Sequence, residues 1–354
     1  MNALILGPKS KDPIGWWQIS PFYEHRNQLK KMLGLNFMHC EAYGVDEFNA
    51  IIAEHNSAEI LFIRPQWRTD PESITAFFKQ LRESYPDKKI VLIDPFDQTS
   101  SRFFGVLPYV NCMVKYQSLR DKSLYLNDYA GGNVQTGRLA DQGYDLGGWH
   151  VGSTVRPGDE KKIISGWFAV EQALVDKFRS SFRLTPITKK SLDLFCHVSC
   201  GRRDALEWYG MYRKDTIEKL ATLESKYKVS VNADFAGEPR IPRKEYLSSV
   251  KRSRILFSPL GWGEITMRAY ESVVNRSLLI QPCVEHLEVN PNIFIKDETY
   301  VPIKWDLSDL VEKMSMYIEN EKRCTEIVAN ANTALMEYYD NKEFVNIVER
   351  VLAY

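Results

Sequence analysis

One segment of the sequence, residues 253–282, combines residue types that could bind a phosphate. An apolar run, a loop with two glycines, a polar stretch of helix length and a second apolar run predict a strand, a loop, a helix and another strand. Gly261 and Gly263 have no side chains, so the loop backbone can come close to a ligand. Free N–H groups at the start of the next helix favour an anion, above all a phosphate.

Two carboxylates belong to the same segment. Glu264 and Glu271 are seven residues apart, which is two helical turns, so we expect both side chains on one face. A carboxylate beside a phosphate site can accept hydrogen bonds from sugar hydroxyls. The alternatives are an intrahelical ion pair between Glu264 and Arg268, worth a few tenths of a kcal/mol, and a solvated carboxylate at Glu271.

Basic residues that could neutralise a phosphate come earlier in the chain. Residues 192–198 predict a strand, and Arg202 and Arg203 follow in the loop at its carboxyl end. Arg213 and Lys214 come further on. Arginine can hold a phosphate through two parallel hydrogen bonds. Each of the four could also be an ordinary exposed surface charge.

The first half of the chain offers a candidate base. Residues 7–17 form a predicted loop after the first strand, and Asp12 in it could take the proton of an attacking hydroxyl. Trp16 or Trp17 could stack on the face of a sugar. Asp12 precedes a proline, however, and that combination is also common turn chemistry.

Four other residues stay open as proton acceptors. Asp94 and Asp97 follow another predicted strand, residues 89–93. His25 and His150 are the other two, although a lone histidine is more often structural.

Short apolar runs alternate with amphipathic stretches and must position these residues. In the first half, the predicted strands are residues 3–6, 36–40, 59–63, 89–93 and 110–114, and the predicted helices are residues 22–33, 45–55 and 73–85. The glycine-rich residues 116–160 read either as long loops around a site or as a surface excursion. A helix over 161–178 and a polar linker over 179–190 complete this half.

A second α/β series follows the linker. Its predicted strands are residues 192–198, 228–231, 255–258 and 277–281, its helices are residues 204–226, 242–251 and 264–274, and three further helices, 306–318, 321–339 and 342–352, end the chain. Apolar strands that each precede a helix predict a parallel sheet covered on both faces. Two such domains would leave a cleft at the carboxyl ends of their strands, where ligands bind.

A family resemblance rests on the pattern S-P-x-G-x-G-E-x-x-x-R-x-x-E, followed by a strand and Pro282. It resembles the donor-binding segment of GT-B glycosyltransferases, most closely the exostosin-like branch, and more distantly the group 1-like retaining members with paired glutamates. Those glutamates are usually eight residues apart, whereas here the spacing is seven. Residues 298–309 also resemble the end of such a domain, so the resemblance covers about residues 192–340.

The resemblance implies two Rossmann-like domains facing a central cleft. Residues 1–185 would bind the acceptor and residues 186–340 a nucleotide sugar, while residues 341–354 would form a C-terminal helix able to pack back on the N-terminal domain. It implies sugar transfer to a glycan hydroxyl from a nucleotide-diphosphate sugar, UDP- or GDP-linked, without a metal or other cofactor. Glu264 would be catalytic together with Asp12, Glu271 would hold the ribose, Arg213 ranks first among the diphosphate ligands, and the remaining donor-binding residues would be Gly261, Trp262, Gly263, Thr266 and Arg268.

Composition limits the class of protein. The 354 residues carry 46 Lys+Arg and 46 Asp+Glu with 44% hydrophobic residues, which is typical of a globular chain long enough for two domains. Zero net charge argues against a nucleic-acid or anionic-membrane partner. Six scattered cysteines without a C-x-x-C pair indicate neither a metal site nor a disulfide scaffold, and no apolar run is long enough to span a membrane, so we expect a cytoplasmic protein.

Two other functions compete with sugar transfer. A protein that keeps the cleft without the chemistry would be a non-catalytic carbohydrate- or nucleotide-binding protein. An oxidoreductase or epimerase using a dinucleotide would need G-x-G-x-x-G after the first strand, and the residues from Leu6 to Lys11 do not supply it.

Overall fold

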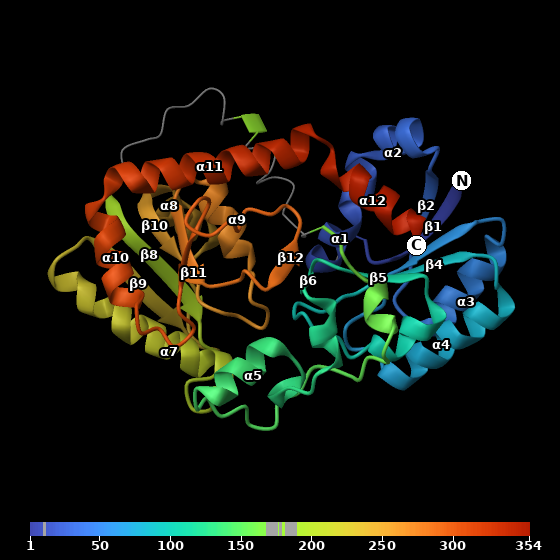
Figure 1. The fold of residues 1–354 in the computed structure, drawn as a ribbon, viewed down its shortest axis with the longest axis horizontal. Helices are drawn as coiled ribbons and strands as arrows, with labels where there is room; N and C mark the ends of the chain where they lie inside the picture. The colour runs from blue at the N-terminus through green and yellow to red at the C-terminus, as the bar shows by residue number, and fades with distance from the viewer. Residues whose placement is uncertain (10–11, 168–175, 177–178, 181–189) are drawn as a thin grey trace.

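The computed structural model describes residues 1–9, 12–167, 176, 179–180 and 190–354. They form two α/β halves that lie side by side (Figure 1), with the N-terminal half on the right of the view and most of the C-terminal half on the left. Each half is built on its own parallel sheet, so the predicted pair of Rossmann-like domains is confirmed.

The N-terminal sheet has the strand order β2-β1-β3-β4-β5-β7, and all of its pairings are parallel. Its strands are β1 (Asn2–Gly7), β2 (Asn36–Glu41), β3 (Ile60–Ile63), β4 (Lys89–Ile93), β5 (Cys112–Lys115) and β7 (Ile163–Ser165). The helices between them are α1 (Pro13–Glu24), α2 (Arg26–Leu33), α3 (Val45–Glu54) and α4 (Pro71–Ser84). Every residue of β3 is buried because helices cover both faces of the sheet.

The C-terminal sheet has the order β13-β11-β10-β8-β9 and is also parallel. Its strands are β8 (Leu192–Ser199), β9 (Val229–Asp234), β10 (Ser253–Phe257), β11 (Leu278–Pro282) and β13 (Val301–Ile303). Its helices are α7 (Trp208–Ala221), α8 (Arg243–Arg252), α9 (Met267–Val274), α10 (Leu310–Glu319) and α11 (Glu321–Asp340), and α12 (Glu343–Ala353) ends the chain.

The prediction was wrong at the first helix. Residues 22–33 contain the end of α1 and all of α2, which meet at His25, where the backbone leaves helical geometry. Helix α1 begins as early as Pro13 because the carboxylate of Asp12 accepts a hydrogen bond from the Gly15 amide, and proline suits a first helical turn. Residues 13–17 of the predicted loop 7–17 are therefore helix.

Residues 116–167 also differ from the prediction. They contain β6 (Gln117–Leu119) and α5 (Val134–Asp141), and β6 pairs antiparallel with β12 (Leu287–Val289) of the C-terminal half. The predicted helix over 161–178 is wrong at its start, where β7 extends the N-terminal sheet beside β5. Most of its later part, most of the predicted linker and the predicted boundary at 185/186 lie outside the described residues.

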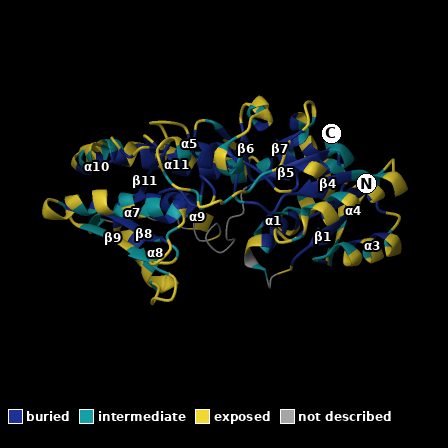
Figure 2. Ribbon diagram, turned by 90° about the horizontal axis from the view of Figure 1, so that it is seen from below, coloured by how far each residue is buried: buried dark blue, intermediate teal, exposed yellow. Residues whose placement is uncertain are grey.

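The two halves share a hydrophobic core. One buried cluster includes Phe103 of the N-terminal half together with Tyr270 of α9 and Leu335 of α11. Helix α11 runs from the C-terminal half toward the N-terminal one (Figure 1), and α12 lies on the N-terminal half, where Ile347 and Phe344 pack with residues of β1 and β3. In Figure 2 the strands are mainly buried, while many helices keep an exposed outer face.

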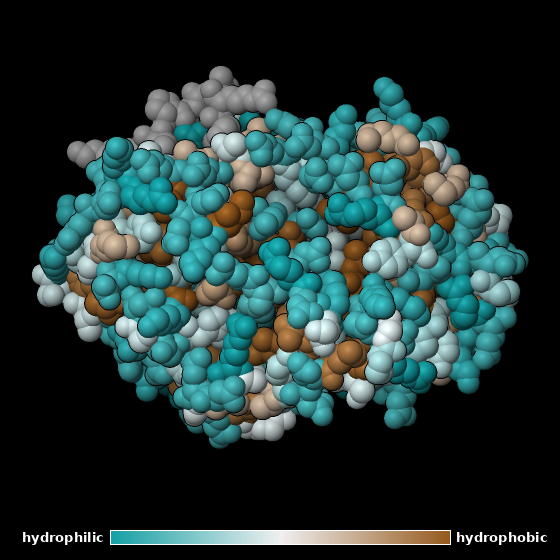
Figure 3. Space-filling view, viewed as in Figure 1, coloured by the Kyte–Doolittle hydropathy of each residue, from teal (hydrophilic) through white to brown (hydrophobic). Residues whose placement is uncertain are grey.

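The described helices include none that is both long and apolar enough to cross a membrane. The face seen in Figure 3 is mostly hydrophilic, and its hydrophobic residues lie in separate groups between polar and charged ones.

Candidate active site

Two adjoining cavities lie where the halves meet. The first, which we call the N-terminal cavity, encloses about 540 Å³ and is lined by Asp12, Ile14, Arg64, Gln66, Trp67, Arg68, Pro95, Phe96, Asp97, Gln98, Arg102, Trp149, His150, Val151 and Trp262. The second, the C-terminal cavity, encloses about 380 Å³ and is lined by Ile14, Trp17, Gln18, Pro95, Asp97, Tyr116, Ser199, Tyr209, Arg213, Gly261, Trp262, Gly263, Ile265, Thr266 and Met267. The cavities meet at the residues common to both linings: Ile14, Pro95, Asp97 and Trp262.

Sheet topology explains the positions of these cavities. In the N-terminal sheet, β1 lies between β2 and β3, so the chain runs outward in opposite directions from β1. In the C-terminal sheet, β8 lies between β9 and β10 in the same way. Loops after neighbouring strands separate at such a point and leave a crevice. The loops after β1 and β3 line the N-terminal cavity, and those after β8 and β10 line the C-terminal one.

Arg213 is the basic residue that the fold carries into the C-terminal cavity. It extends from α7, its Nε donates to the carbonyl of Leu260 at 2.8 Å, and its Nη1 donates to the carbonyl of Ser199. Burial, followed by the nearby charge of Arg268, lowers the pKa of Arg213 to about 10, so the guanidinium stays protonated at neutral pH. The two carbonyls hold it at the ends of β8 and β10.

Arg268 lies on α9 near Arg213. Its Nε and Nη1 groups are buried and have no hydrogen-bond partner among the described residues. Thr266 immediately precedes α9 and lines the C-terminal cavity. Its hydroxyl group lies 3.2 Å from the hydroxyl group of Ser258. Unpaired buried donors cost free energy, so an anion at the start of α9 would stabilise this region.

The two glycines of the predicted ligand loop are close to protein groups. A Cβ on Gly261 would lie 2.9 Å from Nη2 of Arg213. One on Gly263 would lie less than 3.0 Å from the carbonyl oxygen of Asp97 and from the side-chain amide of Gln117. The absence of side chains at 261 and 263 therefore lets the arginine and the N-terminal half approach the loop.

Two buried glutamines tie this loop to the N-terminal half. Gln117 of β6 donates to the carbonyl of Asp97 and accepts a hydrogen bond from the amide of Ile265 at 3.3 Å. Gln135 of α5 donates to the carbonyl of Gly261 at 2.8 Å. These bonds fix the position of the C-terminal loop relative to Asp97.

Glu264 and Glu271 do not share a helical face, because α9 begins only at Met267. Glu264 lies in the loop, is 1% exposed, and has one carboxylate oxygen 3.4 Å from Nε2 of His286 and the other without a partner among the described residues. Glu271 is on α9 and pairs with Arg243 of α8. Neither glutamate lines either cavity. The alternative of an intrahelical Glu264–Arg268 pair is not present in the structure either.

The other predicted cations lie on the surface. Arg202 pairs with Asp204, and Arg203 pairs with Glu238. The ammonium group of Lys214 is 3.7 Å from the carboxylate of Glu218, one turn along α7. All three are exposed and none lines the two cavities described above. For them the alternative of a surface charge is the better description.

Asp12 reaches the N-terminal cavity but has two structural contacts. Besides capping α1, its carboxylate is 3.3 Å from Nη1 of Arg64. Trp17 lines the C-terminal cavity, whereas Trp16 packs against Tyr23 and His39 and lines neither.

The alternative acids after β4 lie in different surroundings. Asp94 is fully buried and paired with the equally buried Lys115, so its position is structural. Asp97 lines both cavities. Burial raises the pKa of Asp97, while a hydrogen bond from Tyr116 and the charges of Lys115 and Arg64 oppose that rise. A carboxylate of this kind can accept a proton at the junction of the cavities.

The two histidines are also separated by the fold. His25 stacks on Phe344 of α12 and lines neither cavity. His150 lines the N-terminal cavity. Within the described part of the chain, no group of three or more His, Cys, Asp or Glu side chains is arranged to hold a metal ion.

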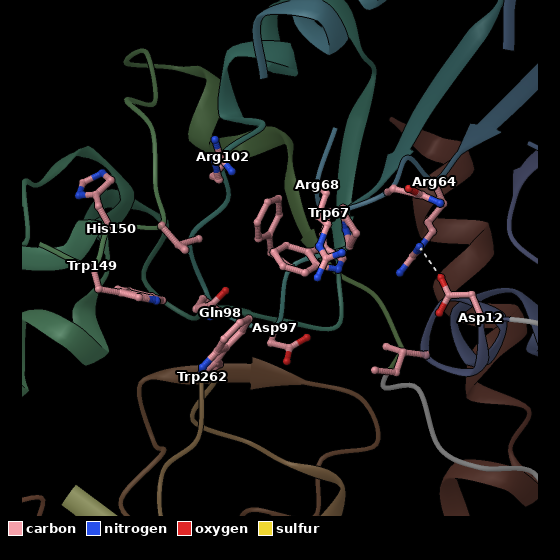
Figure 4. A pocket seen from close by; sticks show the side chains of 15 residues that line it. Asp12, Arg64, Trp67, Arg68, Asp97, Gln98, Arg102, Trp149, His150 and Trp262 are labelled. Carbon is pink, nitrogen blue, oxygen red and sulfur yellow. Dashed lines mark hydrogen bonds and ion pairs between the residues drawn. The ribbon is translucent and has the colours of Figure 1, made fainter. Parts of the chain in front are cut away.

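Several lining residues were missed in the sequence analysis. Arg64, Trp67 and Arg68 follow β3 directly, and Arg102 and Trp149 come from later loops (Figure 4). The segment from Arg64 to Arg68 could have been found, because it stands at a predicted strand end just as Asp94 and Asp97 do. Arg102 and Trp149 are brought in by loops, and the sequence gives no signal for that.

Comparison with known proteins identifies the fold class. No protein-family model matches the sequence, and no curated protein matches it. Solved structures do match: an alpha-glucosyltransferase in complex with UDP-glucose and DNA containing an abasic site is similar over 98% of this chain and 99% of that chain, with a TM-score of 0.51 and 9% identity. The alpha-glucosyltransferase in complex with UDP and a 13-mer DNA containing an A:G mismatch gives a TM-score of 0.53 at 6% identity, over 98% of this chain and 100% of that chain.

A third match is a glycosyltransferase from Rickettsia africae ESF-5, with a TM-score of 0.50 and 13% identity over 98% of each chain. Together with the two parallel sheets and the crevice between them, these similarities assign the chain to the GT-B fold.

Proposed function

We propose that this protein is a glycosyltransferase that moves a sugar from a nucleotide-diphosphate sugar to a hydroxyl group of a carbohydrate acceptor. The observation that carries the proposal is the position of Asp97, which lines both cavities at the point where they meet. A transfer between two bound substrates needs a proton acceptor at their junction.

The donor is assigned to the C-terminal cavity. Arg213 lines this cavity and would supply positive charge, Arg268 on α9 would add to it from outside the lining, and the amides at the start of α9 would supply further donors for a diphosphate. These fixed charges would stabilise the leaving nucleotide diphosphate as the bond to the sugar breaks, and the proposal requires no metal for that step. Solved structures with this fold contain UDP or UDP-glucose, which makes UDP the first nucleotide to test.

The acceptor is assigned to the N-terminal cavity. Its hydroxyl would approach the donor sugar beside Asp97, and the carboxylate would take the proton as the new glycosidic bond forms. We prefer Asp97 to Asp12 as the base because Asp12 lines only one cavity and is bound to the Gly15 amide and to Arg64. A cytoplasmic location is part of the proposal, because all six cysteines are unpaired, as expected in a reducing compartment.

Two measurements test this function. UDP, GDP, CMP and dTDP are screened for a rise in melting temperature, and the matching nucleotide sugars are incubated with the protein to detect nucleotide release. We expect one nucleotide to raise the melting temperature and its sugar conjugate to be consumed. A shift without consumption of donor, with or without added saccharides, would instead indicate a non-catalytic binding protein, and no shift at all would refute the donor site.

The base is tested with a pair of matched variants. Asp97→Asn keeps the shape of the side chain but removes the proton acceptor, so transfer should fall by about 10²–10⁴-fold while nucleotide binding remains. Asp12→Asn should lower transfer much less. The reverse ranking of the two variants would assign the base to Asp12.

A further inference from the structure

The N-terminal cavity is lined by more positive than negative side chains, although its half of the chain is neutral. Residues 1–167 contain 19 Lys+Arg and 19 Asp+Glu, so this half carries no net charge. Three guanidinium groups nevertheless line one cavity, those of Arg64, Arg68 and Arg102. Two carboxylates, those of Asp12 and Asp97, line the same cavity, so its lining has one more positive than negative side chain.

Among the described residues, only Arg64 of these three arginines has a carboxylate partner. Arg64 is 3.3 Å from Asp12, and its Nε donates to Gln18 at 2.8 Å. Arg68 and Arg102 are exposed and make no ion pair within the described ranges. Two guanidinium groups are thus available to a ligand in the cavity.

Aromatic rings stand beside these charges. The guanidinium of Arg68 lies 4.7 Å from the ring centre of Trp67, and Trp67 meets Trp262 edge to face across the cavity at 6.1 Å. Trp67 and Trp262 are 41% and 40% exposed, so each keeps a ring surface for a ligand. In Figure 4, Trp262 rises from the C-terminal half opposite Arg68 and Arg102, and Asp97 lies beside Trp262. An exposed tryptophan can stack on the apolar face of a sugar, and arginine can bind a carboxylate or sulfate through two parallel hydrogen bonds.

A third cavity adjoins the N-terminal cavity. A cavity of about 200 Å³ is lined by polar residues that include Asn127, Asn133 and Ser153, and it shares His150 with the N-terminal cavity. Amide and hydroxyl groups of this kind match sugar hydroxyls. An acceptor that reaches both cavities has more than one sugar unit.

We propose that the acceptor is an acidic oligosaccharide. Its anionic group binds Arg68 and Arg102, a sugar ring stacks on Trp67 or Trp262, and its reacting hydroxyl faces Asp97. A DNA duplex fits less well, because duplex binding needs many phosphate contacts spread over a basic surface, and this half is neutral overall. The inference rests on the proposed function, since it names the acceptor class of the same site.

Binding of matched saccharides tests the acceptor class in the full chain with UDP present. The probes are digalacturonic acid, its neutral counterpart digalactose, a 6-sulfated digalactose and a 13-base-pair DNA duplex. We expect at least tenfold tighter binding of an acidic disaccharide than of digalactose, and a weaker preference at high salt. A preference for the carboxylate or for the sulfate identifies the anionic group. Equal affinity for acidic and neutral sugars, or tighter binding of DNA than of any saccharide, would overturn the inference.

Arginine variants locate the site. Arg68→Ala and Arg102→Ala should each reduce the acidic-to-neutral ratio by about tenfold, whereas Arg156→Ala should preserve it, because Arg156 is exposed and lines none of the three cavities. The UDP-induced rise in melting temperature shows that each variant is folded. That rise and donor turnover test the proposed function separately: if both are present without acidic selectivity, only the acceptor inference fails.

Discussion

Replacing Gly263 by alanine tests whether the C-terminal loop positions Asp97. The new Cβ would lie less than 3.0 Å from the carbonyl oxygen of Asp97 and from the side-chain amide of Gln117. To reach an ordinary van der Waals distance these groups must move apart by about 1 Å. Overpacking of this kind costs about 1–3 kcal/mol, and each kcal/mol lowers the melting temperature by about 2–4 °C for a domain of this size.

The effect of Gly263→Ala on activity should exceed its effect on stability. A displacement of about 1 Å between reacting groups can cost about 100-fold in rate, so we expect kcat for sugar transfer to fall by that order at a temperature where the variant is fully folded. Gly44→Ala is the matched control, because nothing lies within 4 Å of its Cβ position and its φ is −122°. It should cost about 0.5 kcal/mol as a poorer helix N-cap and leave kcat unchanged.

Two results would refute this reasoning. If Gly263→Ala melts lower but transfers sugar at the normal rate, the contact of the loop with Asp97 does not position the base. If neither the melting temperature nor kcat changes, the two halves do not approach each other this closely in solution.

Three further predictions follow from the buried charges. Lys115→Ala leaves Asp94 buried without its partner, so we expect urea denaturation to show a loss of about 3–5 kcal/mol of unfolding free energy. The double variant with Asp94→Ala should recover part of this loss. A loss below about 1 kcal/mol would show that the pair does not stabilise the fold. Arg213→Ala should weaken nucleotide binding at least tenfold by calorimetry, while the exposed Arg203→Ala should not, and equal affinities would remove Arg213 from the donor site. Because burial raises the pKa of Asp97, its proton-accepting form appears only above the usual aspartate value of about 4, so kcat/KM should fall as pH falls through this higher pKa. Persistence of that acid limb in Asp97→Asn would assign it to another group.

Hydrogen bonds and a strand pairing between the two halves explain why a change in one cavity should affect the other. Gln117 and Gln135 join loops of the N-terminal half to residues 261–265, and β6 pairs with β12 across the same boundary. Both glutamines are buried, so their hydrogen bonds do not compete with water. The relative position of the two cavities is therefore fixed by specific bonds at their junction.

The sequence predicted the strands well. The apolar runs at residues 3–6 and 255–258 became β1 and β10 within a few residues, because a strand buried on both faces needs a continuous apolar segment. The run at residues 36–40 also became a strand, β2, although β2 lies at the edge of the sheet and is partly exposed. The sequence predicted the first residues of the helices less accurately. A cap decided the beginning of α1 at Pro13, and the loop before α9 extended through Thr266, which removed Glu264 from the helix.

For the candidate site, the sequence determined which loops meet at the cleft, since parallel strands place all their carboxyl ends at one edge and chain order assigns the loops to those ends. Asp97 was one of the open alternatives at such a strand end, whereas Trp262, Thr266 and the preference for Arg213 came from the family resemblance. Only the tertiary structure decided which charges face inward. Arg202 and Arg203 form ion pairs with carboxylates at the surface, whereas Arg213 points inward and donates hydrogen bonds to backbone carbonyls. The orientation of each of these side chains depends on contacts between residues far apart in the chain, and local sequence patterns do not predict such contacts.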